Sequence, residues 1–101
     1  WFQNGITDSW NSNLKIMPCM NIIKGTCCPH YDEEPERKPT VKKLLTSMKV
    51  RKIFAVDGGA ALHIKNEKNF RSIIFKKHRS AYEVSFEKEN LVEKSFKQII
   101  L

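Results

Sequence analysis

The sequence predicts an α/β fold whose opening strands lie outside these 101 residues. Three observations predict it: apolar side chains at helical spacing over residues 39–48, a short apolar run on each side of that segment, and an apolar period of two from residue 60 onwards. The predicted order is strand, helix, strand and then antiparallel hairpins. Because so small a parallel sheet cannot cover both of its faces, further strands are expected to complete it.

The first strand is expected over residues 21–28. Residues 1–17 before it contain turn-forming runs such as Asn4-Gly5 and Thr7-Asp8-Ser9, and are predicted to form turns or loops. Pro29 ends the strand, because proline cannot donate to a sheet ladder. His30 is thereby placed at the carboxyl end of a strand, where open α/β sheets hold their ligands and catalytic groups.

A helix is predicted to begin near Pro39, a residue favoured in the first helical turn. Its apolar residues form one stripe: Val41, Leu44, Leu45 and Met48. A second buried strand follows at residues 53–56 and ends in the turn Asp57-Gly58-Gly59. Alternating residues then predict antiparallel hairpins over residues 60–75 and 82–96. The tail from residue 97 is either a last strand or a ragged terminus.

The net charge of +7 raises the question of nucleic-acid binding. The lysines are scattered along the chain, and no aromatic platform repeats between them as proteins that bind single strands require. We therefore interpret the charge as a solvated, lysine-rich surface, and predict no nucleic-acid partner. No apolar run is long enough to span a bilayer, so no membrane contact is expected either.

The three cysteines, at positions 19, 27 and 28, make a poor disulfide framework, because their number is odd and two are adjacent. This usage fits a reducing cytoplasm, and the expected role of the thiols is that of small buried side chains. Cys27, Cys28 and His30 are too crowded to serve as three ligands of one tetrahedral site. No metal and no cofactor is therefore predicted.

Two residues stand out as candidates for chemistry, His30 and Asp8. Taken alone, a histidine between proline and tyrosine is more often a hydrogen-bonded structural residue than a catalytic one. An aspartate in Thr7-Asp8-Ser9 usually caps a helix or a turn. No serine lies in a G-x-S-x-G elbow, the strained turn that presents a nucleophile above a sheet.

Residues 1–96 resemble the dipeptidase E family of serine peptidases, which includes the α-aspartyl dipeptidases and cyanophycinases. Three runs carry the resemblance: Trp1-Phe2 with Gly5 and Thr7-Asp8-Ser9; Cys27-Cys28-Pro29-His30-Tyr31-Asp32 with Glu36-Arg37; and Ala55-Val56-Asp57-Gly58-Gly59-Ala60-Ala61-Leu62. The resemblance implies a flavodoxin-like sheet, as in class I glutamine amidotransferases, with an antiparallel C-terminal hairpin meander. Residues 1–101 would then be the C-terminal portion of a single peptidase domain.

The resemblance also implies roles. His30 matches the general base and Asp8 the acidic member of a Ser-His-Asp triad, whose serine would precede Trp1. The implied activity is hydrolysis of short peptides, aspartyl peptides in particular, by a cytoplasmic enzyme without metal. The 101 residues alone are expected to be inactive, because the serine and the oxyanion donors lie outside them.

Substrate contacts are weaker predictions. Arg37, Asp57 and Gly58 follow the two matched strand ends and could contact an acidic substrate. The alternatives are an ion pair of Arg37 with Glu33 or Glu36, and a plain turn at residues 57–59.

Two other functions stay open at this point. One is a glutamine amidotransferase-like enzyme with a cysteine nucleophile, and the other is a non-catalytic remnant of a truncated gene. The residue at the missing elbow would decide between a serine and a cysteine enzyme. The oligomeric state is open between a monomer and a homodimer.

Overall fold

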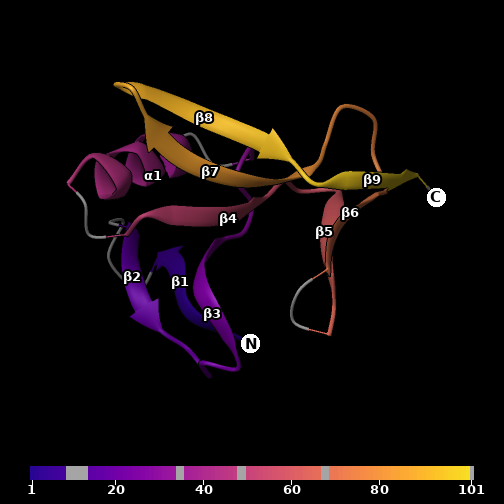
Figure 1. The fold of residues 1–101 in the computed structure, drawn as a ribbon, viewed down its shortest axis with the longest axis horizontal. Helices are drawn as coiled ribbons and strands as arrows, with labels where there is room; N and C mark the ends of the chain where they lie inside the picture. Colours follow the sequence, from indigo (N-terminus) through magenta and orange to yellow (C-terminus); the bar gives the residue numbers. More distant parts are fainter. Residues whose placement is uncertain (9–13, 34–35, 48–49, 67–68, 101) are drawn as a thin grey trace.

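Two β-sheets and one helix make up the described part of the chain (Figure 1). The computed structural model describes residues 1–8, 14–33, 36–47, 50–66 and 69–100. Six strands form the larger sheet in the order β2-β1-β3-β4-β7-β8, and three form the smaller sheet in the order β5-β6-β9. This is a mixed α/β arrangement. The elements are β1 (Phe2–Asp8), β2 (Leu14–Pro18), β3 (Ile23–Cys28), α1 (Arg37–Thr46), β4 (Lys52–Val56), β5 (Ala60–Lys65), β6 (Asn69–Ile74), β7 (Ala81–Glu87), β8 (Asn90–Ser95) and β9 (Lys97–Ile100).

The centre of the larger sheet is parallel. β1 runs parallel to β3 with Gly5 opposite Cys27, and β3 runs parallel to β4 with Cys27 opposite Phe54. β2 and β7 flank this centre and run antiparallel to β1 and β4. The strands predicted at residues 21–28 and 53–56 are therefore present as β3 and β4. The carboxyl ends of β1, β3 and β4 meet at one edge of the sheet.

The prediction of turns or loops over residues 1–17 is wrong for the residues that the structure describes there. β1 and β2 form an antiparallel pair, and Ile6 of β1 is fully buried. Asn4 and Gly5 have turn preferences, but pairing with β3 and the burial of Ile6 outweigh them. Gly5 also gives room to a neighbour, since a Cβ there would lie 3.3 Å from the Sγ of Cys19.

Helix α1 packs on the larger sheet and begins at Arg37, two residues before the predicted start. Pro39 lies in the first turn, where backbone N–H groups have no acceptor within the helix. Val41 and Leu45 are buried and Leu44 packs beside them, as the stripe predicted. Met48 lies outside the described residues. The shared core comprises Ile6, Cys28, Tyr31, Val41, Leu45, Ile53, Ala55 and Val84. No described helix is long and apolar enough to cross a membrane.

The chain leaves the larger sheet after β4 and returns to it with β7. β5 and β6 pair antiparallel, and β9 adds to β6 in parallel. β7 and β8 also pair antiparallel, but β7 lies against β4. Both predicted hairpins are thus present, yet they belong to different sheets and do not form one continuous meander. The tail is a strand through Ile100.

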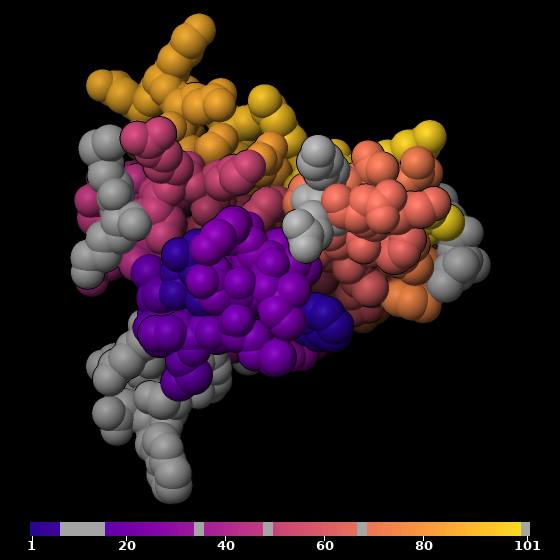
Figure 2. Space-filling model, turned by 60° about the horizontal axis from the view of Figure 1, so that its bottom comes forward, coloured from indigo at the N-terminus to yellow at the C-terminus, as the bar shows by residue number. Residues whose placement is uncertain are grey.

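Aromatic rings join the two sheets. The ring of Phe54 in β4 lies 5.3 Å from that of Phe2 and 5.2 Å from that of Phe70, and the ring of Phe96 lies 5.4 Å from that of Phe70. Figure 2 shows the β1–β3 segment beside the hairpin of β5 and β6 on one face. The Phe54 ring also covers Gly25 of β3, where a Cβ would lie 2.7 Å from it. Gly25 has a φ of 122°, so both backbone and space require glycine.

Candidate active site

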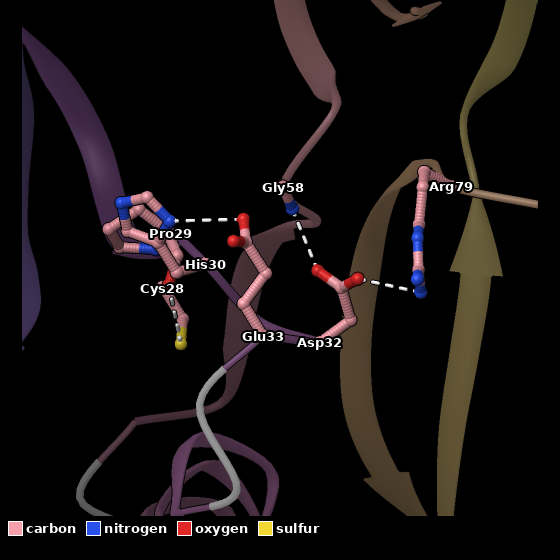
Figure 3. Close-up of polar contacts among 7 residues, drawn as sticks. All are labelled: Cys28, Pro29, His30, Asp32, Glu33, Gly58 and Arg79. Carbon is pink, nitrogen blue, oxygen red and sulfur yellow. Dashed lines mark hydrogen bonds and ion pairs between the residues drawn. The ribbon is translucent and has the colours of Figure 1, made fainter. Parts of the chain in front are cut away.

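His30 lies just beyond the end of β3, separated from it by Pro29 (Figure 3). Its φ is 53°, in the left-handed region that residues other than glycine rarely adopt. Such strain costs on the order of 1 kcal/mol and gathers at functional sites. The side chain is 57% exposed, so the imidazole is open to solvent and to a substrate. His30 therefore lies at the carboxyl end of a parallel strand, the position expected from the sequence.

Glu33 reaches back to His30. The Nδ1 atom of His30 lies 3.3 Å from Oε1 of Glu33, and the Glu33 N–H donates to the His30 carbonyl at 3.2 Å. When Nδ1 carries the proton, it donates to the carboxylate, and Nε2 keeps a lone pair that can accept a proton. The sequence indicates Glu33 only as an ion-pair partner of Arg37. The three-residue spacing between His30 and Glu33 is the signal that could have revealed this contact.

Tyr31 anchors the loop to the core below it. Its N–H donates to the carbonyl of Val56 at 3.0 Å, and its buried ring carries a hydroxyl that donates to Glu93 of β8. Burial raises the pKa of the Tyr31 hydroxyl above its usual range, and the hydrogen bond to Glu93 raises it further. The hydroxyl therefore stays protonated and remains a donor at neutral pH.

Asp32 ties the same loop to two other segments (Figure 3). Its Oδ1 accepts the N–H of Gly58 at 2.7 Å, in the turn after β4, and its Oδ2 lies 2.6 Å from Nη1 of Arg79, in the connection from β6 to β7. The Asp32 side chain is only 9% exposed. Nothing in the sequence links Asp32 to Arg79, because they are brought together only when β4 and β7 pair. The loop that carries His30 is thus fixed at several points.

Asp8 is the last residue of β1 and pairs with Leu14 of β2 through the backbone. Its side chain lies outside what the structure describes. Gly5 is opposite Cys27 in the parallel pair of β1 and β3. Asp8 lies three residues after Gly5, and His30 lies three residues after Cys27, just beyond the end of β3, so both backbones reach the same edge of the sheet.

Arg37 opens helix α1 with its side chain turned inward. It is 3% exposed, and its Nη1 donates to the carbonyl of Ile6 in β1 at 2.6 Å. A buried guanidinium that holds the helix to the sheet favours a structural role over a direct contact with a substrate.

Asp57 and Gly58 form the turn predicted after the second strand. Asp57 is 5% exposed, and its Oδ2 accepts the N–H of Ser80 at 3.1 Å. Desolvation by burial raises the pKa of Asp57 above its usual range. Gly58 donates its N–H to Asp32. Gly58 therefore braces the loop that carries His30 and lies directly beside Glu33, whereas Asp57 is bonded to the connection from β6 to β7.

Comparison with known proteins identifies the family to which the chain belongs. The sequence profile described as Peptidase family S51 matches residues 1–72, which include β1, β3, α1 and the His30 loop. The chain belongs to peptidase family S51. A protein of Bacillus subtilis (strain 168), named "Uncharacterized peptidase YgaJ", is 32% identical over 93 residues, which are 92% of this chain and 40% of that protein. The S51 chain thus spans about two fifths of this relative's length. No solved structure matches the chain.

Two of the three thiols of this S51 chain, those of Cys27 and Cys28, are poorly placed for nucleophilic chemistry. Cys28 is fully buried, and burial raises the pKa of Cys27 to about 12. A thiol with that pKa is almost entirely protonated at pH 7. Cys19 is exposed, which corrects the expectation of a buried side chain there. Within the described residues, no group of three or more His, Cys, Asp or Glu side chains is arranged to hold a metal ion.

Proposed function

We propose that the full-length protein is a serine peptidase that hydrolyses short peptides, with His30 as general base and Asp8 as the acidic member of the triad. The observation that carries the proposal is the position of His30. An exposed imidazole, in a strained backbone conformation, stands at the carboxyl end of a parallel strand in a peptidase-family chain.

The proposed chemistry is acyl transfer. A serine hydroxyl attacks the scissile carbonyl while Nε2 of His30 takes its proton, and His30 then returns that proton to the leaving amine. The register of β1 and β3 supports a place for Asp8 near this base, because both backbones end at one sheet edge. The nucleophile and the oxyanion donors belong to the part of the fold before Trp1, so the 101 residues are proposed to be inactive alone.

The fold proposal follows the same reasoning. β1, β3 and β4 form a parallel group, and α1 packs on the sheet that contains it. We propose that further parallel strands extend this group into the flavodoxin-like sheet of a single peptidase domain, of which residues 1–101 form the C-terminal portion. Cytoplasmic localisation is proposed from the three free thiols.

An aspartyl peptide is the substrate class that we propose. Such a substrate requires a cation beside its acidic side chain. Arg37, Asp57 and Gly58 stay the candidates from the sequence, of which the guanidinium of Arg37 points inward, the carboxylate of Asp57 is buried and the N–H of Gly58 donates to Asp32. We propose no cofactor for this reaction.

A substitution at His30 tests the proposal in the full-length protein. We expect His30→Asn to lower hydrolysis of an aspartyl anilide by at least about 10³-fold, because the serine then has no base. Asparagine tolerates the left-handed backbone, so the loop is expected to keep its shape. His78→Asn is the matched control, since His78 is exposed and has a φ of 62°. Equal loss in both variants, or unchanged turnover in His30→Asn, would contradict the role of His30.

The nature of the nucleophile separates the rival functions. A serine enzyme is expected to be labelled stoichiometrically by a fluorophosphonate and to be protected by substrate. If iodoacetamide labels a cysteine other than Cys19, Cys27 and Cys28 and abolishes a glutaminase activity, the glutamine amidotransferase-like alternative is supported. Absence of turnover and of both labels in a folded full-length protein would support a non-catalytic remnant.

A further inference from the structure

Glu33 is held between two features of the candidate site. On one side its Oε1 lies 3.3 Å from Nδ1 of His30, and on the other its carboxylate fills the space above Gly58 (Figure 3). We propose that Glu33 is the carboxylate that positions His30, and that Gly58 is glycine so that this carboxylate has room. The inference deepens the proposed function and rests on His30 being its general base, and it assigns to Glu33 the contact with Nδ1 that the triad proposed above gives to Asp8.

The space at Gly58 is the first support. A Cβ built at Gly58 would overlap the carboxylate of Glu33, so no side chain fits at position 58 while Glu33 holds this position. The φ of Gly58 is outside the left-handed region, in contrast to that of Gly59, which is 81°. Backbone conformation therefore does not require the glycine, whereas a side chain at position 58 would displace the carboxylate of Glu33.

The rigidity of the loop is the second support. An ion pair between two exposed side chains usually contributes little, because both must lose freedom to form it. Here the segment between the partners is already fixed, by Tyr31 to Val56 and Glu93, and by Asp32 to Gly58. The Glu33 N–H also donates to the carbonyl of His30. Because the loop backbone is already fixed, less conformational entropy is lost when the Glu33 carboxylate contacts the imidazole.

The consequence for the mechanism is the tautomer of His30. A proton on Nδ1 that points at Glu33 leaves Nε2 unprotonated and directed away, as a base for serine requires. When Nε2 takes the proton of the nucleophile, the carboxylate stabilises the imidazolium. Glu33 acts through His30 and does not touch the substrate, so it is a positioning residue. Its contact with Nδ1 is shown by the structure, whereas the role of Asp8 comes from the resemblance.

The test uses three variants of the full-length protein: Glu33→Ala, Gly58→Ala and their combination. We expect Glu33→Ala and Gly58→Ala each to lower kcat roughly 10- to 100-fold with little change in KM, because the first removes the carboxylate and the second displaces it. The combined variant should lose no more than either single one, since both act on one contact. Glu36→Ala is the control: Glu36 is exposed, makes no side-chain cap of α1, and should keep full activity.

A second readout does not depend on catalysis. The ¹⁵N shifts of the His30 imidazole report which nitrogen carries the proton, and we expect the Nδ1–H form in the wild type and a shift towards Nε2–H in Glu33→Ala. If kcat and the tautomer are both unchanged in Glu33→Ala, the inference is overturned. If Asp8→Asn alone changes both, Asp8 holds Nδ1 instead. If the tautomer responds to Glu33 while His30→Asn retains activity, the contact stands and the proposed function fails.

Discussion

Removal of the Asp32 carboxylate is a sharp test of how the His30 loop is held. Asp32→Ala removes the acceptor of the Gly58 N–H and the partner of the Arg79 guanidinium. The hydrogen bond from the Gly58 N–H to the charged carboxylate contributes about 1.5 kcal/mol, and the ion pair about 1 kcal/mol, because Arg79 is 36% exposed and partly screened. We therefore expect a loss of roughly 2–3 kcal/mol in the free energy of unfolding.

The assay is urea unfolding followed by circular dichroism, with thermal melts beside it. Asp32→Asn keeps an oxygen for Gly58 and loses only the charge, so it should lie about midway between Asp32→Ala and the wild type. Glu83→Ala is the control, because it removes the 3.1 Å pair with Lys52, whose side chain is 53% exposed. We expect that control to change stability by less than about 1 kcal/mol. A loss below about 0.5 kcal/mol in Asp32→Ala would refute the view that Asp32 fixes the loop.

Three further predictions concern other parts of the chain. Gly25→Ala should destabilise the fold by roughly 2–4 kcal/mol in urea unfolding, because the new Cβ meets Phe54 at a left-handed φ; a neutral effect would contradict the packing. At pH 8, iodoacetamide should modify Cys19 in the native protein while Cys27, with a pKa of about 12, and buried Cys28 react only after unfolding, as peptide mass spectrometry would show. Because burial raises the pKa of Asp57, the folded chain binds this proton more tightly than the unfolded one, and the contribution of Asp57 to stability falls as pH rises above about 4. Asp57→Asn should remove this contribution from the slope of the unfolding free energy measured from pH 4 to 8, and an unchanged slope would contradict it.

The parts of the fold that the sequence predicts are those with a local pattern. The stripe of Val41 and Leu45 recurs at helical spacing, and the alternation around Tyr82 and Val84 marks a strand, so α1 and β7 are identified without knowledge of their partners. β1 lacks such a pattern, because polar residues surround Ile6. Its conformation depends on pairing with β3, which no local signal encodes.

The candidate site likewise has one part that the sequence indicates and one part that it does not. His30 is indicated by its place after a strand that Pro29 ends. The contacts that fix the loop around His30 are not indicated by the sequence, because Asp32 contacts Arg79 and Tyr31 contacts Glu93 only after distant strands have paired. Periodicity identifies elements, whereas the contacts across the sheet that brace a loop depend on which strands become neighbours.

The bond from Tyr31 to Glu93 also sets a time order for the nascent chain. Its two residues are 62 positions apart, so the buried anchor under His30 cannot form until β8 has been synthesised and has left the ribosome. The hairpin of β7 and β8 is local and pairs quickly. The edge of β4 that faces away from β3, however, stays unpaired until β7 has been synthesised. We expect a ribosome-bound chain that stops before residue 90 to lack the contact between Tyr31 and Glu93, so that the His30 loop is fixed only after β8 has emerged.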